Sequence, residues 1–422
     1  MPVIYRNLTL ILLKLLKEIL MKKPELMAPA GNWTMLTAAI KSGADAVYFG
    51  TDKFTMRAKA KNFGLGELPE LIKFCKEKKI KTYFTLNSLI FEEELYEVDD
   101  LILKLKDMDI DMVICWDLSI VQKCNKYKMP FAISTQASVS NSITANFYKN
   151  LGAKRIVLAR ECSLEEIKKI RASTELEIES FIHGAMCISV SGRCFMSHHL
   201  FGKSANRGEC IQPCRREYEV YDKEIDKSMI IGEDYVLSPK DLCTIEFIDK
   251  LIEAGINSFK IEGRKRSPEY VSKVVSVYRQ AIDLYYEDKL TTQIKNKFLE
   301  ELKKVYNRGF SSGFYFDTPS AENYAVTYGS IATTRKEYIG KVINYYKKPK
   351  VAFIRLESGK IELNNDILII GKTSGVVEVK LNQLLIDEKA VEGAFKGNEV
   401  TFRCEDLVRP NDMVYKVVSI EV

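Results

Sequence analysis

Short apolar runs alternate with amphipathic stretches through the first three quarters of the chain. Stretches such as LPELIKFCKEKK (68–79) carry apolar residues at i, i+3 and i+4, the spacing of a helix with one buried face. The runs predict eight strands: ELMAPAG (25–31), AVYFG (46–50), KTYFTLN (81–87), DMVICWD (111–117), FAISTQA (131–137), RIVLAR (155–160), EIESFIHG (177–184) and INSFKIEG (256–263). Eight strands with intervening helices favour an α/β fold, a closed (β/α)8 TIM-like barrel rather than an open sheet.

The pattern changes after about residue 330, where short strands are separated by Gly, Asn, Asp and Pro. We therefore predict a catalytic barrel over 24–330 and a small all-β barrel domain over 331–422, which either binds RNA or braces the first domain. Residues 1–23 are expected to be an N-terminal appendage, either an amphipathic helix or a stretch ahead of a true start at Met21. The apolar run within them is interrupted by charged residues and is too short to span a bilayer.

Polar residues close several of the predicted strands. They are Asn87, Asp117, Gln136, Arg160, His183 and Glu262. The carboxyl ends of barrel strands converge on the face that carries active sites, so these side chains are expected to ring one opening, with strand-end capping as the alternative for each. We expect catalytic roles for His183, Glu179 and Glu262. Substrate-binding roles are expected for Arg160, Gln136, Asn87, Arg193, Lys260 and Arg264, although Glu262 and Arg264 alternatively pair with each other across the barrel mouth.

A long Cys-rich insertion, residues 185–237, separates the seventh strand from a helix predicted over 238–255. Loops of this length are usually functional or disordered. The insertion carries Cys187, Cys194, Cys210 and Cys214, and Cys243 follows near the start of the predicted helix. Thiolates suit iron or zinc and exclude calcium and magnesium. The spacing matches neither a zinc ribbon nor a ferredoxin, so buried structural thiols are the alternative to a metal site.

The composition sets wider limits on function. The 422 residues include 63 basic and 57 acidic side chains, a net charge of +6, which permits contact with RNA without arguing for it. Ten cysteines without an export signal indicate metal or redox chemistry in a reducing compartment, so we expect a cytoplasmic protein with no membrane association. The five cysteines outside the group described above are expected to be buried hydrophobes.

The stretch ESFIHGAMCISVSGRC (179–194) resembles the signature of the collagenase-like peptidase family U32. The similarity continues through STQASVSN (134–141), RGECIQPCRREY (207–218) and SFKIEGRKRSPEYV (258–271), and covers nearly all of the chain from residue 24 onward. The resemblance implies a protein that carries a 4Fe–4S cluster and hydroxylates RNA or a ubiquinone precursor. With one barrel and one C-terminal β-domain, the chain is most similar to the prephenate-dependent tRNA hydroxylation proteins, which form 5-hydroxyuridine at the wobble position.

The resemblance implies that the cluster is held by Cys187, Cys194, Cys210 and Cys243. Cys214 is the alternative ligand that could take the place of one of them. Nearby basic residues, including Arg215 and Arg216, are expected to hold phosphate or a dicarboxylate such as prephenate, because guanidinium groups suit both anions. The expected partners are tRNA and a related paralogue subunit.

Two other functions compete with RNA hydroxylation. A peptidase needs a nucleophile with a base or a catalytic metal, and proximity in the sequence offers Ser189 or Ser191 as the nucleophile with His183 as the base. The sequence has neither HExxH nor GxSxG, which ranks hydrolysis lower. A non-catalytic RNA-binding accessory protein with a structural cluster is the third alternative.

Overall fold

The computed structural model describes residues 22–218, 220–222, 224, 227–229, 235–327 and 329–420. Most of the expected N-terminal appendage therefore lies outside the described residues, as do parts of the Cys-rich insertion between residues 219 and 234. None of the helices in the described part of the chain is both long and apolar enough to cross a membrane.

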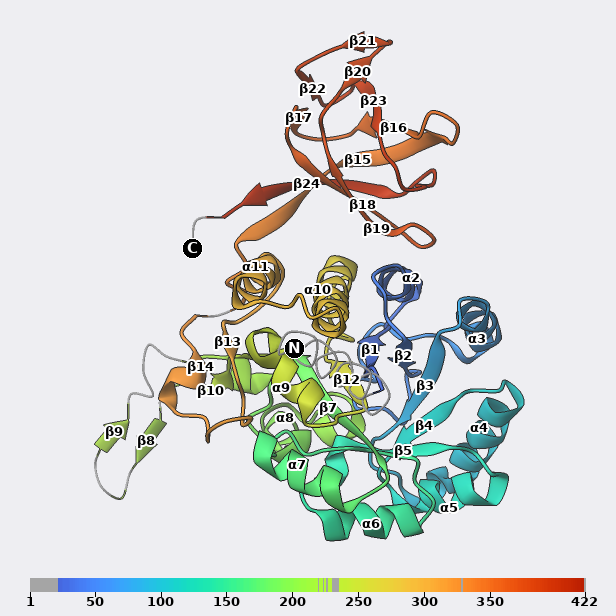
Figure 1. Ribbon diagram of the computed structural model, residues 1–422, viewed down its shortest axis with the longest axis vertical. Helices are drawn as coiled ribbons and strands as arrows, with labels where there is room; N and C mark the ends of the chain where they lie inside the picture. Colours follow the sequence, from blue (N-terminus) through green and yellow to red (C-terminus); the bar gives the residue numbers. More distant parts are fainter. Residues whose placement is uncertain are drawn as a thin grey trace, which may run out of the picture.

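A closed parallel barrel forms the larger domain (Figure 1). Its strands are β1 (Glu25–Pro29), β2 (Ala46–Phe49), β3 (Lys81–Leu86), β4 (Met112–Cys115), β5 (Phe131–Ile133), β6 (Arg155–Val157), β7 (Glu177–Gly184) and β12 (Ser258–Ile261). Each pairs with the next along the chain, and β12 pairs with both β1 and β7, which closes the ring. The predicted (β/α)8 fold class is confirmed.

Helices surround the barrel because each turns one apolar face toward the strands. They are α2 (Trp33–Lys41), α3 (Leu68–Glu77), α4 (Leu95–Asp107), α5 (Leu118–Tyr127), α6 (Ser142–Asn150), α7 (Leu164–Ser173), α9 (Ile248–Glu253), α10 (Pro268–Tyr286) and α11 (Thr292–Lys303). Side-chain caps fix several helix starts, as where Asn32 accepts a hydrogen bond of 3.0 Å from the backbone N–H of Met35. The main core lies between these helices and the outer face of the strands.

The barrel interior is part apolar and part ionic. A small cluster that includes Met27, Tyr83 and Ile114 fills one part. Next to it, Arg155 binds Glu25 at 2.7 Å and Glu179 at 3.1 Å, although all three side chains are almost inaccessible to solvent. Burying charges is costly unless they are paired, so this network stabilises the barrel only as a complete set.

A bulge interrupts the alternation of β7 near its carboxyl end. Phe181 pairs with Lys260 of β12. The next residue of β12, Ile261, pairs with His183 and not with Ile182, so Ile182 is the extra residue. One inserted residue reverses which face the following side chains occupy. Beyond the bulge, β7 also pairs in antiparallel fashion with the short strand β11 (Asp241–Cys243).

The helix predicted over 238–255 is wrong in its first half. Residues there form β10 (Tyr235–Pro239) and β11, and helical structure begins only with a 3-10 turn (Ile245–Phe247) that leads into α9. The reason is long-range pairing: β11 joins β7 on one side and β13 (Phe310–Ser311) on the other. β10 pairs with β14 (Tyr324–Ala325), and β8 (Val220–Asp222) pairs with β9 (Lys227–Met229).

The C-terminal domain is an antiparallel β structure with its own core. Its strands are β15 (Thr334–Tyr346), β16 (Val351–Leu356), β17 (Lys360–Glu362), β18 (Asp366–Gly371), β19 (Gly375–Lys380), β20 (Leu385–Ile386), β21 (Lys389–Ala390), β22 (Gly393–Phe395), β23 (Glu399–Arg403) and β24 (Met413–Ser419). The domain lies beside α2, α10 and α11 (Figure 1). The Thr37 hydroxyl donates to the Lys372 carbonyl at 2.8 Å, and Lys273 of α10 binds Glu378 at 3.1 Å. These contacts brace the domain against the barrel wall.

Candidate functional site

One pocket opens at the carboxyl ends of the barrel strands, with a cavity volume of about 130 Å³. Its floor comes from the strands and from the loops that directly follow them, and the Cys-rich insertion supplies the opposite wall. This is the end of the barrel on which TIM-barrel enzymes carry their active sites. Eleven side chains decide its chemistry: the thiols Cys187, Cys194, Cys210 and Cys214, the carboxylate Glu262 and the six cations Arg57, Arg160, Arg215, Lys260, Arg264 and Lys265.

The four thiols all belong to the insertion, within 28 residues of one another along the chain. The Cys187 sulfur lies 3.0 Å from the Ser189 hydroxyl, and the backbone N–H of Met196 donates to the Cys194 sulfur at 3.3 Å. Burial raises the pKa of the Cys214 thiol to about 11, which Arg215 opposes and the charges of the other three pocket cysteines reinforce. Cys187, Cys194 and Cys210 therefore all lie within electrostatic range of Cys214.

Cys243 lies elsewhere. It is buried in β11, its sulfur 3.8 Å from the Tyr278 hydroxyl, and it does not line the pocket. Burial raises the pKa of this thiol to about 12. The antiparallel pairing of Cys243 with His183 carries it to the outer side of β7. Cys214, the expected substitute, lines the pocket together with the other three thiols.

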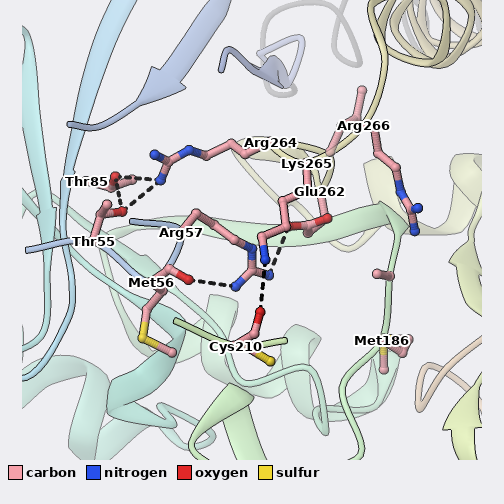
Figure 2. A network of polar contacts seen from close by, with 12 residues as sticks. Thr55, Met56, Arg57, Thr85, Met186, Cys210, Glu262, Arg264, Lys265 and Arg266 are labelled. Atoms are coloured by element: carbon pink, nitrogen blue, oxygen red, sulfur yellow. Dashed lines mark hydrogen bonds and ion pairs between the residues drawn. The ribbon is translucent and has the colours of Figure 1, made fainter. Parts of the chain in front are cut away.

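Positive charge dominates the remaining wall of the pocket. Figure 2 shows Arg57, Arg264, Lys265 and Glu262 converging from β2, β12 and the loops that follow these strands. Arg264 donates to the Thr55 and Thr85 hydroxyls at 2.8 and 3.0 Å, and its side chain is only 3% exposed. Burial lowers the pKa of Arg264 to about 10. Its Nε atom, like that of Arg160, is buried and has no hydrogen-bond partner within the described part of the chain.

Glu262 is the one carboxylate among the described residues that line the pocket. It binds Arg57 at 3.0 Å (Figure 2). Burial alone raises the pKa of Glu262, but Arg57, Arg160 and Arg266 outweigh that effect, so its pKa is lowered and the group is ionised at neutral pH. The expected alternative, a pair between Glu262 and Arg264, is replaced by the pair with Arg57. Six cations against one carboxylate leave the pocket strongly positive.

Lys260 sits at the base of the pocket and Glu179 holds it there. The two side chains are 2.7 Å apart, and the Lys260 ammonium also lies 4.6 Å from the centre of the Tyr48 ring. Burial lowers the pKa of Lys260, and the Glu179 charge opposes that shift. Glu179 itself does not line the pocket, so the geometry gives it a positioning role and not the catalytic contact that we expected.

His183 points away from the pocket. Its ring lies among Tyr270, Tyr278 and Phe310, with centroid distances of 5.5 to 5.9 Å, and its Nδ1 is 3.3 Å from the Tyr278 hydroxyl. Burial, with a contribution from Arg266, lowers its pKa to about 3, so the imidazole is neutral. The bulge at Ile182 explains the orientation, because it turns His183 from the interior face to the helix side. The expected catalytic contact of His183 is not supported by this geometry.

The other expected substrate-binding residues divide into two groups. Asn87, Gln136 and Arg160 line the pocket; the Asn87 side chain donates to Gln136 at 3.4 Å and Arg160 donates to the Ala185 carbonyl at 3.0 Å. Arg193 is exposed outside the pocket and donates to the Ser138 hydroxyl at 3.1 Å. Asp117, the remaining strand-end residue, caps α5 by accepting from the Ser119 N–H at 2.9 Å. The capping alternative therefore holds for Asp117.

Sequence reasoning missed Arg57 and Lys265. Arg57 lies in the irregular segment after β2, where no periodicity marks a side chain as inward-facing. Lys265 donates to the Cys210 carbonyl at 3.0 Å and so ties the loop after β12 to the insertion (Figure 2). The signal that was available is the basic run GRKR directly after the eighth strand, at the catalytic end of the barrel.

The donor set can be tested against the expected metal groups. Within the described residues, no three His, Cys, Asp or Glu side chains converge closely enough to hold one metal ion. A structural zinc site needs that convergence, since its ligands lie about 2.0–2.3 Å from a single ion. An iron–sulfur cluster instead takes its thiolates at separate iron atoms, which suits four thiols spread around one pocket. Cationic neighbours and an N–H donor to Cys194 suit the negative charge of such a group.

The fold and the site define a TIM-barrel protein with a basic, thiol-lined pocket at its catalytic end. The chain matches the pattern of Peptidase family U32 over residues 31–325. It therefore belongs to this family, as the sequence resemblance indicated.

Full-length relatives carry different names. The chain is 42% identical over 405 residues to Uncharacterized protease MJ0090 of Methanocaldococcus jannaschii, across 93% of this chain and 97% of that protein. It is 37% identical over 404 residues to a protein named Collagenase from Porphyromonas gingivalis, across 93% and 97% of the two chains. It is 41% identical over 335 residues to tRNA hydroxylation protein P1 of Bacillus subtilis, across 78% and 79%.

Proposed function

We propose that this protein is an RNA-modifying enzyme that holds an iron–sulfur cluster and forms 5-hydroxyuridine at the wobble position of tRNA. The observation that carries the proposal is the pocket, in which four thiols face a surplus of cations at the catalytic end of the barrel. The relative named for tRNA hydroxylation supports the same reaction class. The proposed ligands are Cys187, Cys194, Cys210 and Cys214, with Cys214 in place of Cys243.

The reaction replaces the C5–H bond of uracil with C5–OH, which adds one oxygen atom and removes two electrons from the base. It therefore needs a co-substrate that donates the oxygen and accepts the two electrons, and we assign this role to a hydroxylated dicarboxylate of the prephenate kind. In the balanced exchange the C–OH bond of the co-substrate breaks as the C5–OH bond of uracil forms, and the co-substrate carbon gains the hydrogen that C5 loses. Arg264 and Arg160 suit such an anion because each has a buried N–H that no described residue accepts. A bound cluster supplies one-electron redox chemistry or orients the co-substrate.

The chain's own residues bind and orient. Glu262 is ionised and fixed by Arg57, so it suits a hydrogen bond from the N–H of a uracil ring. Asn87 and Gln136 offer further amide groups to the edge of a base. A target base inside a duplex or a stacked loop must turn out of its stack to reach an enclosed pocket, as other base-modifying enzymes require.

A peptidase reaction finds less support in the geometry. The Ser191 hydroxyl interacts with the Ser138 hydroxyl at 2.9 Å, and Ser189 interacts with Cys187. His183, the expected base, is packed among aromatic rings and does not line the pocket. A serine nucleophile needs a base within hydrogen-bond reach, and neither pairing supplies one.

Replacing Ser191 with alanine is expected to leave hydroxyuridine formation within about tenfold of wild type, because it removes one neutral hydrogen bond. The measurement is mass spectrometry of tRNA nucleosides from a host that lacks its own hydroxylation proteins and expresses the full chain. Ser189→Ala serves as the matched variant. Abolished modification in a serine variant that still contains its iron would contradict the proposed mechanism and favour serine chemistry.

A further inference from the structure

The outer surface of the Cys-rich insertion carries large apolar side chains that no core uses. Phe195 is 78% exposed, Val190 60% and Leu200 45%, and Phe201 and Ile211 are also exposed. Single exposed apolar residues are ordinary, but five within 22 residues of one insertion form a concentrated group. An exposed aromatic ring offers 150–250 Å² of surface for burial. Among the residues that the structure describes, the insertion therefore leaves these apolar side chains exposed to solvent.

Arginines accompany the aromatic rings on this face. The Arg216 guanidinium lies 4.6 Å from the centre of the Phe201 ring, and that of Arg207 lies 4.8 Å from the Phe91 ring. Arg193 lies 6.0 Å from the Trp116 ring. Residues 185–218 contain five basic and two acidic side chains, together with His198 and His199. Glu94 neutralises Arg207, so Arg193 and Arg216 supply the positive charge of this face. Rings, guanidinium planes and positive charge together suit a polyanion.

This face borders the mouth of the pocket. Phe195 stands between Cys194 and Met196, which both line the pocket, and Arg216 directly follows the pocket residue Arg215. Trp116, the ring beside Arg193, donates its indole N–H to the Asn87 carbonyl at 3.0 Å, and Asn87 is another pocket residue. We name the four exposed residues Phe195, Phe201, Arg193 and Arg216 of the insertion the aromatic rim.

We propose that the aromatic rim binds single-stranded RNA and stacks the nucleotides that flank the base held in the pocket, with Phe195 as the main platform. The inference rests on the proposed function and adds the surface by which the RNA is held. Proteins recognise single-stranded loops by stacking unstacked bases on aromatic rings and arginine planes, and by neutralising phosphates with basic side chains. A protein partner would not require the excess of positive charge that accompanies these rings.

The test uses the full-length protein and a synthetic anticodon stem-loop RNA with uridine at the wobble position, with binding followed by fluorescence anisotropy. Phe195→Ala is expected to weaken binding by about 5- to 150-fold, since loss of one stacked base has an effect of this size. Phe195→Trp is expected to retain binding. Arg193→Ala and Arg216→Ala are each expected to reduce the slope of log affinity against log salt concentration by about one, which corresponds to the loss of one phosphate contact.

The matched control is Phe395→Ala, a 62% exposed phenylalanine of the C-terminal domain, which is expected to bind as wild type. Iron content should stay unchanged in the Phe195 variant, which shows an intact pocket. Unchanged RNA affinity in Phe195→Ala, with hydroxyuridine still formed by wild type, overturns the inference and leaves the proposed function standing. If Phe195→Ala binds the RNA as wild type does but no longer retains a protein that co-purifies with wild type, the face docks a protein and the inference is overturned. A wild-type protein that forms no hydroxyuridine refutes the proposed function itself.

Discussion

Replacing Cys214 with alanine is expected to remove the brown chromophore and to abolish hydroxyuridine in tRNA. A cluster that loses one of its four thiolates is labile, and the loss of bound iron should be at least about tenfold. Cys214 is the informative choice because it lines the pocket with Cys187, Cys194 and Cys210. Visible absorption of anaerobically purified protein measures the chromophore, and nucleoside mass spectrometry measures the modification.

Cys243→Ala is the matched control, since it removes a thiol that is buried in β11 and turned toward Tyr278. It is expected to keep the chromophore and to cost about 1 kcal/mol of stability, as a small buried truncation does. The reverse result, with the chromophore lost in Cys243→Ala and kept in Cys214→Ala, would return Cys243 to the ligand set. That outcome would contradict the arrangement of thiols described above.

Glu179→Ala is expected to destabilise the barrel by about 3–5 kcal/mol. The substitution leaves two buried cations, Arg155 and Lys260, without the carboxylate that they share, and an uncompensated buried charge has a cost of this size. Urea unfolding followed by circular dichroism provides the measurement. Because Glu179 also holds Lys260 at the base of the pocket, binding of an anionic co-substrate should weaken as well.

Glu177→Ala provides the control within the same network. Glu177 binds the same Arg155 at 2.6 Å, but its side chain is 44% exposed. Its removal leaves Arg155 with Glu25 and Glu179, so the expected cost is below about 1 kcal/mol. Equal losses in the two variants would show that burial does not decide the strength of this network.

The barrel could be predicted from the sequence because its signal is local. Each strand is a short apolar run and each helix repeats its apolar residues at helical spacing, so the eight strands were recognised in the right places. The polar residues that close the strands were also informative. Asn87, Gln136, Arg160 and Glu262 all line the pocket, since parallel strands deliver their carboxyl ends to one face.

The errors have long-range causes. His183 follows a bulge in the pairing of β7 with β12, and a single strand's sequence does not reveal such an insertion. Cys243 was assigned to a helix because its neighbours have helical spacing, but pairing with β7 makes it part of a strand. Arg57 comes from an irregular loop, where side-chain direction depends on the partner Glu262 far along the chain.

The most direct test of the central claim is the iron, zinc and acid-labile sulfide content of the full-length protein after anaerobic purification, measured together with its visible spectrum. The account predicts about four iron and about four sulfide per chain, with a broad absorption that fades on exposure to air. Stoichiometric zinc without sulfide, or metal-free protein that still supports hydroxyuridine formation, would contradict it.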